Sequence, residues 1–277
     1  MHIRVLREMT RTNFPAWAVA VLFLLLLAPF QICHAVTFDW PTTPAWAATG
    51  PASGATETIW YGYYANGSVK VSVFNNGETF QAGYPGVAAG GGGVLNGGTT
   101  SNGLILYHNN ASNVVTNYSR VTIDFLYTGG ASNITFNLWD VDLGAGVFTD
   151  KIANIVGTTL AGATVQATTI TPSAGFNQVN GTVGVAGVNV TGVAAAGNTS
   201  AQGNVTIGFS QTVKSISFEW SNTLAGGTTQ AVGVSPVTFT GIGTAFPEIG
   251  SASGALSLCG GLLAFRRRRK NATRLTD

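Results

Sequence analysis

Short runs rich in β-branched and aromatic residues fill residues 57–240, and glycine, asparagine or serine separates one run from the next. The runs at 57–64 and 68–74 flank Asn66-Gly67, a pair that favours the positive φ angles of a tight hairpin turn. No segment of this region combines sustained helical periodicity with capping residues. Further strands are predicted at 103–107, 120–127, 133–141, 163–171, 181–190, 204–209, 215–220 and 237–240.

This pattern predicts an all-β domain, an antiparallel β-sandwich or jelly roll, over residues 55–245. Residues 36–54 include a stretch rich in proline, alanine and threonine and are expected to form a lead-in loop. An N-terminal signal helix and a C-terminal transmembrane helix are expected on either side of the sandwich.

One sequence pattern occurs twice in the body of the chain, residues 36–245. Residues 121–125 (VTIDF) precede a turn and then 134–136 (ITF), and residues 205–209 (VTIGF) precede a turn and then 216–218 (ISF). Alternate residues are apolar in each unit, so each is predicted to be a hairpin with one face toward the core. The two hairpins could then lie on facing sheets.

The charges of the body argue against nucleic-acid binding. Between residues 36 and 245 there are four bases and eight acids, which leaves about four negative charges. The bases are Lys70, Arg120, Lys151 and Lys214, and the acids are Asp39, Glu57, Glu78, Asp124, Asp140, Asp142, Asp150 and Glu219. Because a DNA or RNA partner requires a basic surface, no nucleic-acid partner is expected.

The N-terminus has the organisation of a secretory signal peptide. Arg4, Arg7 and Arg11 precede an apolar run at 16–30, and Cys33 and Ala35 supply the small residues of a cleavage site. Residues 1–35 are therefore predicted to direct Sec-type export and to be removed after Ala35. The alternative is an uncleaved N-terminal anchor. Since the two cysteines, Cys33 and Cys259, lie outside the body, the body has neither a disulfide nor a thiol nucleophile.

The C-terminal segment 246–270 has three parts. The motif Phe246-Pro247-Glu248-Ile249-Gly250 leads into 17 uncharged residues, 249–265, and then into Arg266, Arg267, Arg268, Arg269 and Lys270. A helix of this length reaches about 25 Å, a marginal membrane span that the arginines could extend by snorkelling. The basic cluster 266–270 is expected to stay on the cytoplasmic side.

The Pro-Glu step, the apolar helix and the arginine cluster resemble the PEP-CTERM sorting signal of bacterial surface proteins. That resemblance implies recognition and cleavage by an exosortase-like membrane enzyme, transient anchoring in the inner membrane, and export in an organism that makes extracellular polysaccharide. Ile249 stands where the second proline of that motif is expected. Residues 246–250 also resemble the sortase motif Leu-Pro-x-Thr-Gly, with Ile249 in place of threonine, and a retained anchor is the third alternative.

One acidic cluster is a candidate metal site. Asp140 and Asp142 share a face at the end of a predicted strand, and a glycine-containing loop leads from them to Asp150. Carboxylate and carbonyl oxygens that converge on a loop suit Ca²⁺, which would be structural here. The alternative is that these acids cap the strand and solvate a turn.

The sequence lacks the usual signals of an enzyme. His108 is the only histidine of the body, and no Gly-x-Ser-x-Gly nucleophile motif occurs. A carboxylate pair for glycoside hydrolysis could be assembled from Glu57, Glu78, Asp124 and Glu219, and a sugar-stacking platform from Trp60, Tyr61, Tyr63 and Tyr64.

The sequence therefore predicts a non-enzymatic protein of the cell surface or extracellular matrix, with a structural or adhesive role beside exopolysaccharide. The alternative is a jelly-roll carbohydrate-binding module or a glycan-active enzyme.

Overall fold

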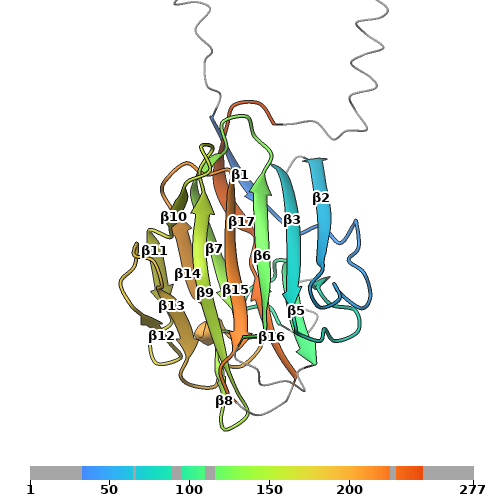
Figure 1. Cartoon of the computed structure of the whole chain (residues 1–277), viewed down its shortest axis with the longest axis vertical. Coiled ribbons are helices and arrows are strands. Elements are labelled where there is room, and N and C mark those ends of the chain that lie inside the picture. Colours follow the sequence, from blue (N-terminus) through green and yellow to red (C-terminus); the bar gives the residue numbers. More distant parts are fainter. Residues whose placement is uncertain (1–32, 65–66, 89–94, 110–115, 225–228, 246–277) are drawn as a thin grey trace, which may run out of the picture. The chain divides into compact units, whose positions relative to one another are not determined.

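The computed structural model describes residues 33–64, 67–88, 95–109, 116–224 and 229–245. Its strands form two antiparallel sheets that face each other, and the only helix in these ranges is a 3₁₀ turn, Ala201–Gly203. The prediction of an all-β, two-sheet sandwich is confirmed (Figure 1).

Sheet A has eight strands. Its main path runs β1 (Cys33–Phe38), β17 (Val237–Ile242), β7 (Ala131–Trp139), β16 (Thr229–Val234), β5 (Gly103–Asn109) and β4 (Gly86–Ala88). Two more strands, β14 (Val205–Phe209) and β11 (Thr169–Pro172), continue this sheet from β7.

Sheet B has nine strands. Its path runs β12 (Asn177–Asn180), β13 (Asn189–Gly192), β9 (Phe148–Thr158), β15 (Ser215–Asn222), β6 (Tyr118–Phe125), β3 (Gly67–Asn76) and β2 (Thr56–Tyr64). Two short strands, β8 (Leu143–Gly144) and β10 (Thr164–Gln166), pair with β9. The predicted pairing of the first two runs is confirmed, since β2 and β3 are antiparallel neighbours.

Alternation of apolar and polar residues places the core between the sheets. Along β6 the residues Val121, Ile123 and Phe125 are buried, while the residues between them are partly exposed. Because side chains alternate between the two faces of a strand, the polar residues of sheet B gather on its outer face. Sheet A closes the core from the other side with Ile134, Phe136, Leu138, Val205 and Ile207.

The repeated pattern is real, but the prediction of two hairpins is wrong. Each unit crosses from one sheet to the other: β6 lies in sheet B and β7 in sheet A, and β14 lies in sheet A and β15 in sheet B. The two units then pair with each other twice, with Ile123 opposite Ile216 in sheet B and Phe136 opposite Ile207 in sheet A. Each connection therefore passes from one sheet to the other and does not join two neighbouring strands of one sheet, as a hairpin turn does.

Several strands differ from the prediction. The region expected as a strand at 181–190 is mostly the turn between β12 and β13, where Gly181, Gly184 and Gly187 have positive φ angles. The run at 163–171 divides into β10 and β11, which belong to different sheets. The strands β1, β4, β8, β9, β12 and β16 were not predicted.

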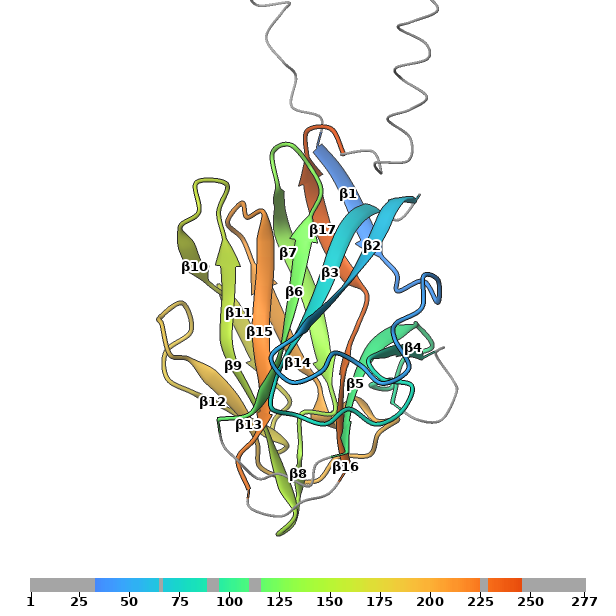
Figure 2. The ribbon, with the colours of Figure 1, turned by 45° about the vertical axis from the view of Figure 1, so that its right-hand side comes forward.

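The lead-in loop is shorter than predicted, because β1 extends to Phe38. This strand contains the predicted cleavage position after Ala35 and pairs with β17 from Cys33 opposite Ile242 to Phe38 opposite Val237. The first and last strands of the sandwich thus lie side by side, so the two ends of the described body meet at one end of sheet A (Figure 2).

Most of the predicted signal peptide and all of the predicted sorting signal, from Phe246 through Arg269, lie outside the described residues. Within the described ranges, no helix is long and apolar enough to cross a membrane.

Candidate functional site

The structure brings the three predicted calcium ligands close together. Asp140 and Asp142 follow β7, and Asp150 lies near the start of β9. The backbone N–H of Asp142 donates to Asp150 Oδ2 over 3.1 Å, and Trp220 Nε1 donates to Asp150 Oδ1 over 2.8 Å. The N–H of Ala196 donates to Asp142 Oδ2 over 2.7 Å. Both oxygens of Asp150 therefore already have protein donors.

These carboxyls are buried, and no base among the described residues forms an ion pair with them. Asp150 is 0% and Asp140 8% exposed, and burial raises the pKa of Asp140 to about 7, with a further contribution from the charge of Asp142. Burial also raises the pKa of Asp142 and raises that of Asp150 well above its ordinary value.

This arrangement gives no support to the predicted calcium ion. Among the described residues, no three histidine, cysteine, aspartate or glutamate side chains are arranged to hold a metal. Asp140 Oδ1 is the one carboxylate oxygen of this cluster that is buried without a hydrogen-bond partner. Burial without a neighbouring positive side chain raises the pKa of these carboxyl groups and so favours their neutral, protonated form.

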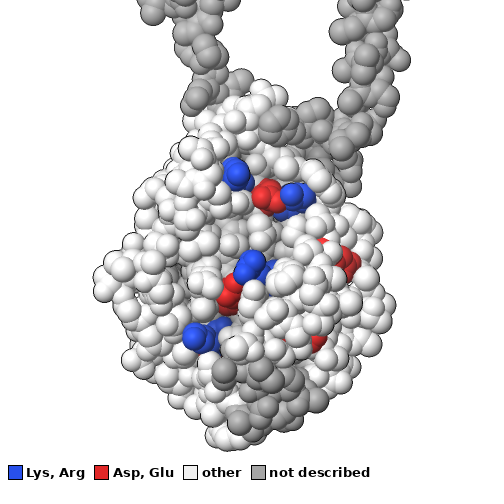
Figure 3. All heavy atoms as spheres, in the orientation of Figure 1, with Lys and Arg blue, Asp and Glu red and all other residues white. Residues whose placement is uncertain are grey.

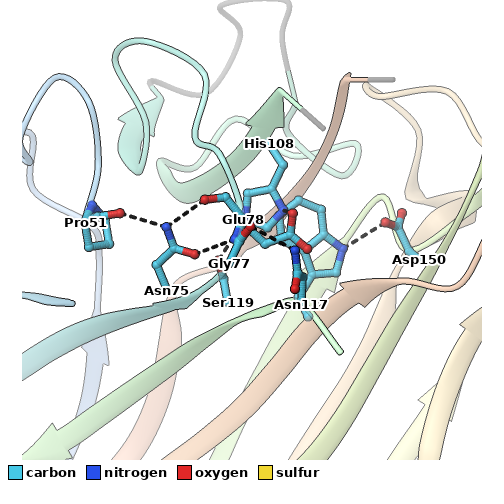
Figure 4. A network of polar contacts seen from close by, with 9 residues as sticks. Pro51, Asn75, Gly77, Glu78, His108, Asn117, Ser119 and Asp150 are labelled. Carbon is cyan, nitrogen blue, oxygen red and sulfur yellow. Dashed lines mark hydrogen bonds and ion pairs between the residues drawn. The ribbon is translucent and has the colours of Figure 1, made fainter. Parts of the chain in front are cut away.

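A second buried polar group was missed by sequence reasoning. His108 on β5 lies between Glu78 and Ser119, with 2.8 Å between its Nε2 and Ser119 Oγ and 3.8 Å between its Nδ1 and Glu78 Oε2 (Figure 4). A carboxyl group, an imidazole and a hydroxyl group follow one another in the same order as in a catalytic triad. The three residues are distant in sequence, so only the fold brings them together.

The surroundings of this group make it part of the core. His108 and Ser119 are both fully buried, and the His108 ring stacks on Trp220 with 4.1 Å between ring centroids. Burial lowers the pKa of His108 to about 3 and raises that of Glu78 to about 7. A general base must accept a proton near neutral pH and must reach substrate, and His108 does neither.

The outer face of sheet B carries the exposed polar and charged side chains. Strand register arranges them in rows across the sheet, one of which runs Phe74, Arg120, Glu219 and Ala153. A second row, four residues away along β3, runs Trp60, Lys70, Asp124 and Ser215. Figure 3 shows acidic and basic side chains spread over this face. The strands are about 4.8 Å apart, so five of them offer a platform of roughly 20 Å.

A cleft of about 300 Å³ opens on this face. Residues of β6, β9, β13 and β15 and of the turn before β13 line it: Tyr118, Lys151, Ala153, Asn154, Gly187, Asn189, Glu219 and Ser221. The cleft thus joins a tyrosine ring to amide, hydroxyl, carboxylate and ammonium groups.

The cleft is held in shape by an ion pair and a β-bulge. Arg120 Nε donates to Glu219 Oε1 over 2.9 Å, and Asn154 Nδ2 donates to Glu219 Oε2. Asn154 has a φ of 49° and lies where β9 has an extra residue opposite β15. A bulge of this kind redirects a side chain, and here it turns the amide toward Glu219. The Arg120 guanidinium lies over the Tyr118 ring, 5.3 Å from its centroid.

The other residues considered as sugar-binding or catalytic groups are scattered. Trp60 is 48% exposed on the outer face of sheet B, whereas Tyr61 is buried and accepts a hydrogen bond from Trp46. The side chains of Tyr63 and Tyr64 lie outside the described part. The four acids do not form a catalytic pair: Glu78 is buried beside His108, Glu57 accepts from the N–H of Ala47, and Asp124 and Glu219 pair with Lys70 and Arg120.

Sheet A has a different outer face. A shallow groove of about 210 Å³ there is lined by β7, β11 and β14, and its residues are uncharged: Asn133, Ile134, Thr135, Thr168, Thr169, Gly208, Phe209 and Ser210. The cleft of sheet B therefore combines charge with an aromatic ring, and this groove carries no charged side chain.

No family model matches the chain, and no curated protein does so either. Two solved structures are remotely similar. One is the family 11 carbohydrate-binding module from Clostridium thermocellum in complex with a β-1,3-1,4-mixed-linked tetrasaccharide, with 10% identity, a TM-score of 0.29, and 78% of this chain and 100% of that chain covered. The other is the family 11 module of the cellulosomal cellulase Lic26A-Cel5E of the same organism, with 10% identity and a TM-score of 0.28. The match covers 75% of this chain and 96% of that chain.

Proposed function

We propose that this chain is an exported protein of the cell surface or extracellular matrix that binds polysaccharide on the outer face of sheet B. Its role is adhesive and not catalytic. The observation that carries the proposal is the cleft around Tyr118, Asn154 and Glu219 on the outer face of sheet B.

The chemistry of the cleft suits a sugar chain. A sugar ring presents hydroxyl groups at its rim and C–H groups on its faces, so it needs fixed hydrogen-bond partners and an aromatic surface. The bulge and the ion pair fix the amide of Asn154 and the carboxylate of Glu219 in advance, which reduces the ordering cost of binding. Tyr118 supplies the ring surface, and Asn189 and Ser221 supply further polar groups.

Affinity electrophoresis tests this function. The full chain is expected to migrate more slowly in a native gel that contains extracellular polysaccharide from the producing organism than in a plain gel. Unchanged migration at every polysaccharide concentration, with the protein folded, would contradict the proposal.

Delivery to the surface is the second part of the proposal. The signal peptide 1–35 starts export, and the segment 246–270 holds the protein in the inner membrane until an exosortase-like enzyme cuts it. The pairing of β1 with β17 supports this arrangement, because Val36, the first residue after the predicted cut, lies opposite Phe239 on the last strand before residues 246–270. A sortase-type cut and a retained anchor remain the alternatives for the last step.

Mass spectrometry of the protein purified from its own cells tests this delivery. The mature C-terminus is expected close to Pro247, without the arginines 266–269. A mature chain that still carries these arginines would show that the segment is an anchor and is not cleaved.

A further inference from the structure

The basic residues of the body are concentrated on one face. Strand register places Lys70, Arg120 and Lys151 on the outer face of sheet B, and Lys214 is exposed at the start of β15 in the same sheet. These are all four bases between residues 36 and 245. Figure 3 shows basic side chains from the upper to the lower part of this face.

The acids are distributed differently. Glu78, Asp140, Asp142 and Asp150 are buried, and two further acids, Asp39 and Glu57, lie outside the rows of this face. Only Asp124 and Glu219 belong to these rows, and each pairs with one base. Two positive charges are thus left over on this face, although the body as a whole has more acids than bases.

One of these two charges lies in the cleft. Lys151 lines the cleft next to Ser221, its neighbour on β15, and no hydrogen bond or ion pair within the described residues holds its ammonium group. Arg120 adds to the positive potential, since its side chain is 41% exposed although it pairs with Glu219. A cleft with low-dielectric walls concentrates such a potential.

From this charge distribution we infer that the ligand of the cleft is an acidic polysaccharide, one whose sugar units carry carboxylate groups. The inference rests on the proposed polysaccharide-binding function. Lys151 binds the carboxylate of one sugar unit, while Asn154, Asn189 and Ser221 bind hydroxyl groups and Tyr118 packs against a ring. A neutral polysaccharide would leave the Lys151 ammonium without a partner.

Equilibrium binding of the full chain to polygalacturonate tests the inference, with a neutral mixed-linkage glucan and polyglutamate as comparison polymers. Lys151→Met is expected to weaken polygalacturonate binding about tenfold, because a charge-assisted contact is worth roughly 1.5 kcal/mol. Lys214→Met removes the same charge from the same sheet outside the cleft, and it is expected to weaken binding less than about twofold. Salt should weaken binding of the wild type more than that of Lys151→Met.

The outcomes separate the inference from the function on which it rests. Equal effects of the two lysine variants, or equal affinity for polyglutamate, would overturn the inference. Tight binding of the neutral glucan that Lys151→Met leaves unchanged would overturn the inference and keep the proposed function. No binding of any polysaccharide would overturn both. If Lys151→Met does not fold, Lys151→Gln provides the same comparison.

Discussion

Replacing Asp140 by asparagine is expected to stabilise the protein at pH 8 and to leave its stability nearly unchanged at pH 4. Asp140 is buried, and its φ of 61° lies in the left-handed region, which asparagine tolerates as well as aspartate does. The substitution removes a charge that the fold disfavours and keeps the shape of the side chain. Thermal unfolding at the two pH values measures the effect.

The sign and size of this effect follow from the raised pKa of Asp140. Well below the ordinary pKa of 3.8 the carboxyl is protonated in both the folded and the unfolded chain, so its stabilising contribution is fully present. That contribution is lost as the pH rises through the folded pKa of about 7. The change from the ordinary pKa of 3.8 to about 7 corresponds to up to about 4 kcal/mol at pH 8.

Two controls make the measurement specific. Asp39→Asn changes an exposed carboxyl and is expected to alter stability by less than about 0.5 kcal/mol at either pH. Protonation of the buried His108 at low pH destabilises wild type and variant equally, so it does not change the difference in stability between them. If calcium occupies the site, chelation destabilises the wild type and Asp140→Asn destabilises the protein in calcium; that result would contradict the protonated arrangement.

Replacing Gly192 by alanine is expected to cost about 3 kcal/mol or more in free energy of unfolding. A Cβ at this position would lie 1.9 Å from the backbone oxygen of Asp142, so either β13 or the segment after β7 must move. Since β13 also carries Asn189 of the cleft, polysaccharide binding should weaken as well. Urea unfolding and the binding assay measure the two effects.

Gly197 provides the matched control for this substitution. A Cβ there would be no closer than 3.8 Å to a neighbouring side chain, so Gly197→Ala is expected to change stability by less than about 0.5 kcal/mol. Equal stability of the two glycine variants would contradict the close packing of β13 against the Asp142 segment.

The fold class was predictable because the apolar alternation is local. The strands β3, β6 and β14 keep a period of two and were found near their actual positions. The long strand β9 was missed because the bulge at Asn154 breaks this period: Ile152 and Ile155 are both buried although they are three residues apart. Each repeated unit passes from one sheet to the other, and this depends on tertiary packing, which the alternation of apolar and polar residues does not specify.

The aspartate cluster and the cleft also differ in how far the sequence predicts them. Asp140, Asp142 and Asp150 are close in sequence, so their proximity in space was predictable, whereas their burial was not. The cleft combines residues of four strands between Tyr118 and Ser221, and only the strand register brings them together. The bulge at Asn154 and the pairing of Arg120 with Glu219 also depend on register, since these residues are far apart along the chain.

The most direct test of polysaccharide binding on sheet B compares two tyrosines. Tyr118 lies in the cleft of sheet B, and Tyr107 lies half-buried on β5 of sheet A. The measurement is the dissociation constant of wild type, Tyr118→Ala and Tyr107→Ala for one bound polysaccharide. We expect Tyr118→Ala to weaken binding about tenfold, or roughly 1.4 kcal/mol, and Tyr107→Ala to leave it unchanged. A loss with Tyr107→Ala and none with Tyr118→Ala, both variants being folded, would contradict the assignment of the binding face.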